Sequence, residues 1–456
     1  MRYFSTRGQT EPVAFQDAVL MGLASDGGLL IPERIPQVGD KLGAWAGLSF
    51  PDLAFEVLSP YVGDIPEADL RRLINAAYAT FDSEAVVPLH PLKDLYVQEL
   101  WHGPTLAFKD VALQLLGQLF EYILEARGEH LNILGATSGD TGSAAIAGAR
   151  GRNNIDIFIM FPEGKTSPIQ ELQMTTVADE NVHALAIDGT FDDCQAILKS
   201  IFRDLPFKAR WHLGAVNSVN WARVLAQVVY YFHAYYAAGQ KPLAFSVPTG
   251  NFGDIFAGWL AAKMGLPITQ LILATNENDI LSVFFNTGRY ARGEVKFTIS
   301  PSMDIQVASN FERFLFYRLG ENAEALRGAM ESFAETGAFQ LDDGAPIDDL
   351  ICAQAVGREE TLATITAVHE EEGYLLDPHT AVGVAAGRAL RKGDEPLVCL
   401  ATAHPSKFPE AVNGAVGAPL ATHPRVEGLA GLPKRSTPLP ASEDAVKAFI
   451  EAHGRS

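Results

Sequence analysis

Apolar runs of strand length alternate with segments of helical spacing along most of this 456-residue chain. Alternation of this kind predicts α/β lobes with largely parallel sheets. Because 48% of the residues are hydrophobic, the chain can bury a core large enough for two or three lobes. The strand-like runs are residues 131–136, 155–161, 182–187, 243–247, 268–274 and 396–402.

The chain is expected to divide into three parts. Residues 1–90 mix short helical patterns with turns and look like an accessory N-terminal domain. Residues 91–421 contain the alternating runs and are expected to form two α/β lobes, the smaller at about 130–205. Residues 422–456 begin rich in Pro and Gly, end in a helix-like stretch, and are expected to pack on the core.

Charge and cysteine content exclude several classes of protein. The formal charge of −20 repels nucleic acid and anionic membrane surfaces, so neither is an expected partner. Cys194, Cys352 and Cys399 are too scattered for a disulfide framework or a zinc site, and no metal is expected. The N-terminus lacks an apolar signal region, and the most apolar later run is interrupted by Gln227 and His233. A cytoplasmic location is expected.

The sequence HGPTLAFKD at residues 102–110 places Lys109 where a tight Gly-Pro turn becomes an amphipathic helix. The alternative is that Lys109 is an ordinary surface lysine without a functional role. A cation in the first turn of a helix is unfavourable to the helix dipole, so another interaction is expected to hold Lys109 there. A lysine in apolar surroundings has a lowered pKa and can attack carbonyls. Lys109 is therefore the candidate Schiff-base residue.

Two loops that follow strand-like runs are rich in glycine and polar residues, GATSGDTGS at 135–143 and PTGNFGD at 248–254. Ligands of open α/β sheets bind at the carboxyl ends of strands, where such loops lie. Both loops open a helix, so their N–H groups can bind a carboxylate or phosphate, and Asn251 and Asp254 can cap the second helix. Either loop alone can be a simple strand-to-helix turn. Two of them beside Lys109 favour anion binding.

Other phosphate motifs are excluded. The segment Gly164 to Thr166 has the tail of a P-loop, but Ile159 stands where the first glycine is required. The region 138–148 lacks GxGxxG spacing, which argues against a dinucleotide site.

A third polar cluster is NSVNWAR at 217–223, where a helix is expected to begin at Trp221. Arg223 would then lie in the first turn, and its planar guanidinium suits a phosphate. The alternative is that Arg223 pairs with a surface carboxylate, of which this acidic chain has many. Thr402, at the end of the last strand-like run, is expected near the ligand-bearing edge of the sheet.

Taken together, these motifs resemble the threonine synthase family, which belongs to the fold type II (tryptophan synthase β-like) pyridoxal-phosphate enzymes. The resemblance covers nearly the whole chain. Several ordered motifs of this length are specific, although each short one alone is not. The matching segments are residues 4–8, 22–32, 102–110, 137–142, 217–223, 248–254, 301–304, 377–381 and 402–408.

The resemblance implies pyridoxal 5'-phosphate as the cofactor, with Lys109 as its covalent anchor and Thr402 facing its pyridine nitrogen. The loop implied to hold its phosphate consists of Gly250, Asn251, Phe252, Gly253 and Asp254. A carboxylate would repel the substrate carboxylate, so Asp140 is expected to point away or to bond to a backbone or hydroxyl donor. The residues implied to bind substrate are Thr137, Ser138, Asp140, Thr141, Asn217, Ser218, Asn220, Arg223 and, as a weaker candidate, Lys165.

The implied reaction belongs to threonine biosynthesis and converts O-phospho-L-homoserine and water into L-threonine and phosphate, with Lys109 as general base. One alternative is another lyase of the same fold, either threonine dehydratase-like or a β-replacement enzyme; a phosphorylated γ-substituent separates them. A second alternative is a non-catalytic protein that binds pyridoxal phosphate. A monomer or homodimer is expected, without activation by S-adenosylmethionine because a long N-terminal extension is absent.

Overall fold

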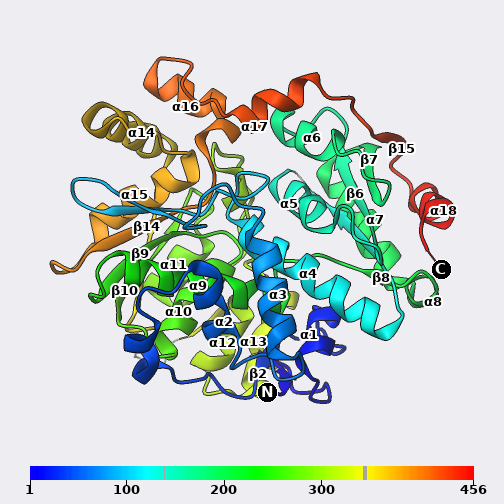
Figure 1. The fold of residues 1–456 in the computed structure, drawn as a ribbon, viewed down its shortest axis with the longest axis horizontal. Coiled ribbons are helices and arrows are strands. Elements are labelled where there is room, and N and C mark those ends of the chain that lie inside the picture. Colours follow the sequence, from blue (N-terminus) through cyan, green and yellow to red (C-terminus); the bar gives the residue numbers. More distant parts are fainter. Residues whose placement is uncertain (138, 342–346, 456) are drawn as a thin grey trace.

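The computed structural model describes residues 1–137, 139–341 and 347–455 and contains two large sheets (Figure 1). The larger has six strands, and only its edge pair β3/β4 is antiparallel. Its strands, in spatial order, are β13 (Ile351–Ala355), β10 (Ile268–Thr275), β9 (Leu243–Pro248), β14 (Leu397–Ala401), β4 (Tyr96–Glu99) and β3 (Leu89–Pro91).

The smaller sheet has five strands, all parallel. In spatial order they are β15 (Thr437–Pro440), β7 (Val182–Asp188), β6 (Ile155–Pro162), β5 (Leu131–Ala136) and β8 (Leu213–Gly214). The C-terminal chain therefore supplies an edge strand to this lobe, and β8 lies beyond residue 205. Both sheets confirm the α/β class expected from the sequence.

All six strand-like runs form strands, because they lie in the buried centres of the two sheets. Every residue of β6 and of β9 is buried, which produces the continuous apolar runs typical of parallel strands. The sequence did not indicate β15, whose residues Pro438 and Pro440 interrupt any strand pattern. Proline is tolerated there because β15 pairs on one side only.

The N-terminal part packs on the larger lobe (Figure 1). It contains the antiparallel pair β1 (Tyr3–Ser5) and β2 (Leu30–Pro32), with aromatic contacts between Tyr3 and Trp221 at 6.0 Å. Its helices are α1 (Phe15–Met21), η1 (Gly39–Trp45), α2 (Phe50–Leu58) and α3 (Glu67–Tyr78).

The remaining helices cover the sheets. Those up to α10 are α4 (Lys109–Arg127), α5 (Asp140–Ala149), α6 (Pro168–Thr175), α7 (Phe191–Arg203), α8 (Leu205–Arg210), α9 (Trp221–Ala237) and α10 (Gly253–Lys263). The next group is α11 (Ile280–Thr287), η2 (Pro301–Met303), α12 (Phe311–Arg318), α13 (Ala323–Thr336), α14 (Arg358–Glu372) and α15 (Pro378–Leu390), with the strand pair β11 (Arg289–Ala291) and β12 (Ala338–Gln340). The chain ends with η3 (Pro405–Lys407), α16 (Pro409–Val416), α17 (Pro424–Glu427), η4 (Gly428–Gly431) and α18 (Glu443–His453).

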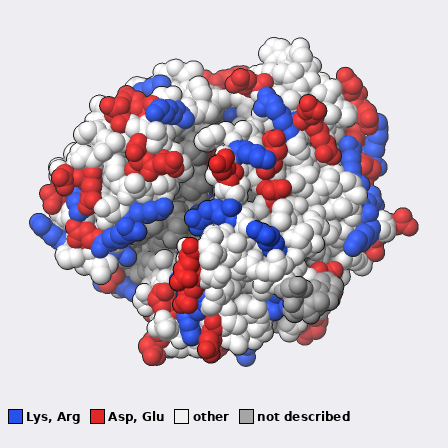
Figure 2. All heavy atoms as spheres, turned by 180° about the vertical axis from the view of Figure 1, so that it is seen from behind, with Lys and Arg blue, Asp and Glu red and all other residues white. Residues whose placement is uncertain are grey.

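Acidic and basic side chains are interspersed on the face seen in Figure 2, which is hollowed near its middle with basic side chains at the rim. None of the helices in the described ranges is both long and apolar enough to cross a membrane.

Candidate active site

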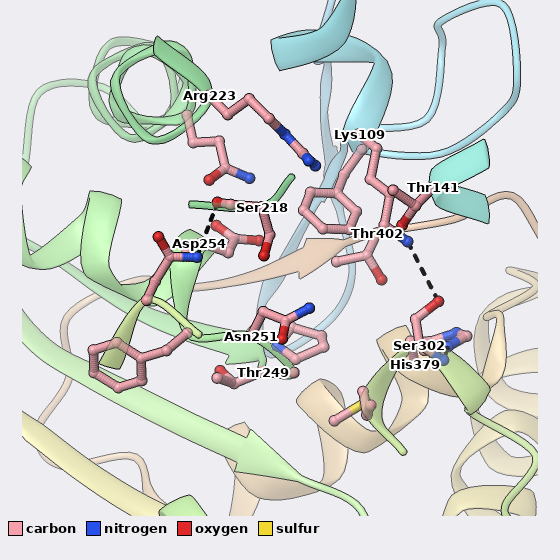
Figure 3. A pocket seen from close by; sticks show the side chains of 18 residues that line it. Lys109, Thr141, Ser218, Arg223, Thr249, Asn251, Asp254, Ser302, His379 and Thr402 are labelled. Atoms are coloured by element: carbon pink, nitrogen blue, oxygen red, sulfur yellow. Dashed lines mark hydrogen bonds between the residues drawn. The ribbon is translucent and has the colours of Figure 1, made fainter. Parts of the chain in front are cut away.

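Lys109 is the first residue of α4, as the sequence predicted, and backbone pairing holds it beside Thr402. The Phe108 N–H donates to the Thr402 carbonyl at 2.8 Å, and the His404 N–H donates to the Leu106 carbonyl at 3.0 Å. The Leu106 side chain is buried, and its backbone has the left-handed conformation, with φ of 60°. Because this conformation is unfavourable for leucine, the surrounding structure must hold the turn in place. Two segments almost 300 positions apart are thereby joined at the cavity drawn in Figure 3.

The Lys109 amine lies in a buried polar cluster. Its Nζ is 3.5 Å from the Ser302 hydroxyl and 3.8 Å from Asp140 Oδ2, and its side chain is 11% exposed (Figure 3). Burial lowers the pKa of Lys109, Lys407 and Arg223 add to the effect, and Asp140 opposes it. The surface-lysine alternative is therefore wrong, and the expected lowering of the amine pKa is confirmed.

Asp140, the first residue of α5, is paired within the protein. Its Oδ1 lies 2.9 Å from Lys407 Nζ and accepts from Gln170 at 2.8 Å, while its Oδ2 accepts from the Ser302 hydroxyl at 3.1 Å. Burial alone raises the pKa of Asp140, but Lys407 and Lys109 hold it well below its usual range. The carboxylate thus bonds to a hydroxyl donor, as expected, and carries a full negative charge between two lysines.

Lys407 was not singled out as a site residue from the sequence, because a lysine on a short 3-10 helix is normally exposed. Here it is 1% exposed. Besides Asp140, its amine donates to the Thr105 carbonyl at 2.8 Å and to Gln173 Oε1 at 2.9 Å. Lys407 is therefore a buried structural cation that shares Asp140 with Lys109.

The loop between β9 and α10 presents a cradle of backbone donors. The N–H groups of residues 250–254 make no hydrogen bond to any other residue in the described ranges. Gly250 is required by close approach, since a Cβ there would lie 2.6 Å from the Ser302 carbonyl oxygen. Consecutive unbonded N–H groups at a helix start form an anion site. The cradle and Lys109 line the same cavity.

The predicted capping of α10 by Asn251 and Asp254 is wrong. No described side chain caps this helix, and Phe252 at its start is left-handed with φ of 66°. Asp254 instead accepts hydrogen bonds from Tyr230 and from Tyr231, and burial raises its pKa to about 7. Asp254 is therefore used by the two tyrosines, whereas Asn251 is exposed.

Arg223 enters the same cavity from α9, which begins at Trp221 as predicted (Figure 3). It is 6% exposed, and its Nη1 has no hydrogen-bond partner among the described residues. Burial lowers its pKa to about 10. The alternative pairing with a surface carboxylate is therefore wrong within the described ranges. A buried guanidinium without an anion is a site for a ligand that brings one.

Three further predicted residues line the cavity, Thr141, Ser218 and Thr402, together with Asn251 of the cradle. Ser218 is below Arg223 in Figure 3, and its Oγ lies 2.7 Å from the Ser309 hydroxyl. Thr141 comes from the smaller lobe and the other three from the larger one. The cavity therefore lies between the two lobes.

Five predicted substrate residues of the described ranges do not line the cavity: Thr137, Asp140, Asn217, Asn220 and Lys165. Thr137 accepts from the N–H groups of Gly139 and Gly142, both at 3.0 Å, so it shapes the loop rather than facing a ligand. Asn220 caps α9 and donates to Val19 at 2.8 Å. These side chains are already used in local structure.

Asn217 lines a separate hollow beside α1, and Lys165 is exposed, with its amine on the Gly189 carbonyl at 2.9 Å. Ser138 lies outside the described residues. The described residues contain no group of three or more His, Cys, Asp or Glu side chains suited to a metal ion.

Ser302 and His379 line the cavity but were assigned no role from the sequence. The Ser302 N–H donates to His379 Nε2 at 3.1 Å, and His379 Nδ1 lies 2.8 Å from Asp377 Oδ1. Since Nε2 accepts, the proton of a neutral ring is on Nδ1 and faces the carboxylate. The segments 301–304 and 377–381 were the available signal, since both belong to the matching motifs.

Three family models together match most of the chain. They are described as threonine synthase N terminus, pyridoxal-phosphate dependent enzyme and threonine synthase C-terminal, over residues 2–78, 81–402 and 380–450. The threonine synthase of Pseudomonas aeruginosa is 49% identical, with 100% of this chain and 99% of that protein covered. The chain belongs to the threonine synthase family.

Solved threonine synthase structures share the whole fold. The pyridoxal-phosphate-bound threonine synthase from Brucella melitensis is 48% identical, covers 100% of both chains and superposes with a TM-score of 0.97. The yeast threonine synthase is 43% identical, covers 99% of this chain and 98% of its own, and has a TM-score of 0.95. The chain is thus a member of the pyridoxal-phosphate-dependent fold type II enzymes, and the predicted family and fold are confirmed.

Proposed function

We propose that this threonine synthase family member converts O-phospho-L-homoserine and water into L-threonine and phosphate, with Lys109 as the covalent anchor of pyridoxal phosphate. The observation that carries the proposal is that one cavity has two separate features for anions. One is the N–H cradle of residues 250–254, and the other is the Arg223 guanidinium, whose Nη1 has no hydrogen-bond partner in the part of the chain that the structure describes. A phosphorylated cofactor and a phosphorylated substrate together need both.

The cavity fits pyridoxal phosphate. The cradle of residues 250–254 would hold its phosphate, and a side chain at Gly250 would close the gap to Ser302. Lys109 supplies the amine, and Thr402 supplies a neutral hydroxyl for the ring nitrogen. When bound, the cofactor supplies an electron sink conjugated to the substrate amino group.

Arg223 and Ser218 are proposed to hold the substrate phosphate. A guanidinium can donate two parallel hydrogen bonds to phosphate, and burial makes each stronger than in water. Arg223 also opposes the charge that accumulates on the phosphate as it leaves Cγ. Thr141, at the start of α5, is proposed to contact the substrate from the smaller lobe.

Lys109 is proposed to move the protons of the reaction. A lowered pKa increases the neutral fraction of the amine, which is the form that attacks and accepts protons. Once released by substrate, the amine can take the proton from Cα and serve Cβ and Cγ in turn. Asp140 and Ser302 orient it through the contacts at 3.8 Å and 3.5 Å. His379 accepts from the Ser302 N–H and is itself held by Asp377, so this pair positions Ser302.

The test is a product assay on the purified protein loaded with pyridoxal phosphate. O-phospho-L-homoserine should give L-threonine and phosphate in equal amounts, and Arg223→Gln should raise KM for this substrate much more than it weakens cofactor binding. Arg203→Gln, an exposed position outside the cavity, is the matched control. Release of a 2-oxo acid from L-threonine without phosphate turnover would indicate a dehydratase. Failure of the protein to bind the cofactor would refute a catalytic role.

A further inference from the structure

A second cavity lies where the C-terminal chain crosses the smaller lobe. Residues 425–435 cover it on one side, and α4, α5 and α6 line the other. The C-terminal chain runs from α16 through α17, close to α6, on its way to β15 (Figure 1). The cavity measures about 660 Å³, within the range of small-molecule pockets. None of its described lining residues also lines the Lys109 cavity.

The second cavity is basic in an acidic protein. Four arginines line it and, within the described ranges, no Asp or Glu does, although the chain carries a net charge of −20. The arginines come from two separate segments. Arg150 and Arg152 follow α5, whereas Arg425 and Arg435 belong to the C-terminal chain. An anion between them would be contacted from both sides.

The existing partners of these arginines leave donors for a ligand. Arg150 contacts Asp179 at 2.6 Å, and Arg435 donates to the Ala178 carbonyl at 2.8 Å. Arg152 contacts Glu121 at 2.8 Å and the Gly148 carbonyl at 2.6 Å, and Arg425 contacts Asp82 at 3.4 Å and the Gly103 carbonyl at 2.6 Å. A guanidinium has five N–H donors, and its fork binds phosphate or carboxylate in pairs. The carboxylate partners Asp82, Glu121 and Asp179 are not among the described residues that line the cavity.

Gln114 provides an independent indication of a missing ligand. Its side chain projects from α4, is 2% exposed and lines the cavity. Its amide nitrogen has no hydrogen-bond partner among the described residues. A buried donor without an acceptor is costly, so an acceptor brought by a ligand would satisfy it.

We propose that this cavity is a second ligand site, for a small molecule that carries two or more phosphate or carboxylate groups. Its arginines supply the charge, and Gln114 supplies a buried donor. The site also touches the active-site network, because Gln173 lines it and accepts from Lys407, the partner of Asp140. The proposal does not depend on the substrate of the Lys109 cavity.

The test is calorimetric titration of the cofactor-loaded protein with inorganic pyrophosphate and, separately, with citrate. The variant Arg150→Gln/Arg435→Gln should bind the tighter of the two at least tenfold more weakly than the unaltered protein. Both side chains are exposed, so their loss spares the core. The control Arg203→Gln/Arg289→Gln makes the same change in net charge at exposed positions elsewhere and should bind within twofold of the unaltered protein. Which anion binds tighter identifies the ligand class.

Arg223→Gln separates the second site from the Lys109 cavity. Because Arg223 lines the Lys109 cavity and not the second one, its substitution should leave the binding that depends on Arg150 and Arg435 unchanged while it impairs O-phospho-L-homoserine turnover. Three results would overturn the second site: no binding of either anion, equal binding by the Arg150→Gln/Arg435→Gln variant, or loss of binding in Arg223→Gln. None of them bears on whether the protein forms threonine.

Discussion

Arg223→Gln is expected to stabilise the ligand-free protein while it impairs the enzyme. Burial lowers the pKa of Arg223 to about 10. Since one pKa unit corresponds to about 1.4 kcal/mol, the unfolded state favours the charged form by about 3 kcal/mol more than the folded state. This penalty is fully present at pH 7, which lies below both pKa values. A neutral glutamine removes it but buries an amide, so a gain of about 1–2 kcal/mol in free energy of unfolding remains.

The same substitution should weaken binding of the phosphorylated substrate. Hydrogen bonds to charged groups contribute about 1.5–3 kcal/mol each, so the loss of two corresponds to a KM about 100-fold higher or more. Activity should therefore fall while stability rises, as at binding sites where a residue that destabilises the free protein is needed to bind the ligand. Urea denaturation without substrate and steady-state phosphate release measure the two effects.

Arg313→Gln is the matched control for burial. Arg313 is also fully buried, with its pKa lowered to about 9, but it donates to the carbonyls of Leu30 and Val219 and to Asn310. Its loss leaves three buried oxygens without a donor, at a cost of about 1–3 kcal/mol each, so Arg313→Gln should destabilise the protein. If Arg223→Gln destabilises the protein to a similar extent, or leaves KM unchanged, then Arg223 is a structural arginine and the reasoning fails.

Three further predictions concern the cavity. Lys109→Ala should abolish threonine formation with little change in Tm, because Asp140 keeps Lys407; borohydride reduction followed by peptide mapping should find cofactor attached to Lys109 in the unaltered protein only. Gly250→Ala should weaken pyridoxal-phosphate binding at least tenfold in a cofactor titration, and unchanged affinity would remove the cradle from the site. Burial raises the pKa of Asp254 to about 7, so the free energy of unfolding that this group contributes should fall as pH rises from about 4 to about 7. Urea denaturation across that range should show a flatter pH dependence for Asp254→Asn, and an unaltered slope would contradict this prediction.

Much of the site followed from local sequence. The runs that form β6, β9 and β14 are buried on both faces, so each is continuously apolar and can be recognised without knowing its neighbours. Because the carboxyl ends of parallel strands meet at one edge, the loop at 250–254 and Thr402 were expected near a ligand. Lys109 was recognised because a cation in the first turn of a helix is unfavourable to the helix dipole, so that another interaction must hold it there.

Asparagine and lysine roles were less predictable, because spacing does not tell which face of a loop a side chain occupies. Asn220 was predicted to bind substrate, yet its amide caps α9 and bonds to Val19. Lys165 was predicted near substrate but is exposed, whereas Lys407 was overlooked and is buried. The energy that decides these cases comes from neighbours distant in sequence.

By itself, the sequence determined the α/β class, the strands of the two sheet centres, the covalent lysine candidate and the glycine-rich loop, because each depends on local pattern. Only the tertiary structure decided that Arg223 Nη1 has no hydrogen-bond partner among the described residues, that Asp140 lies between two lysines, and that the C-terminal chain supplies β15 and covers a basic cavity. The physical reason is that burial and charge pairing depend on every atom nearby, and some of those atoms come from segments more than 300 residues apart, as with Arg425 and Asp82.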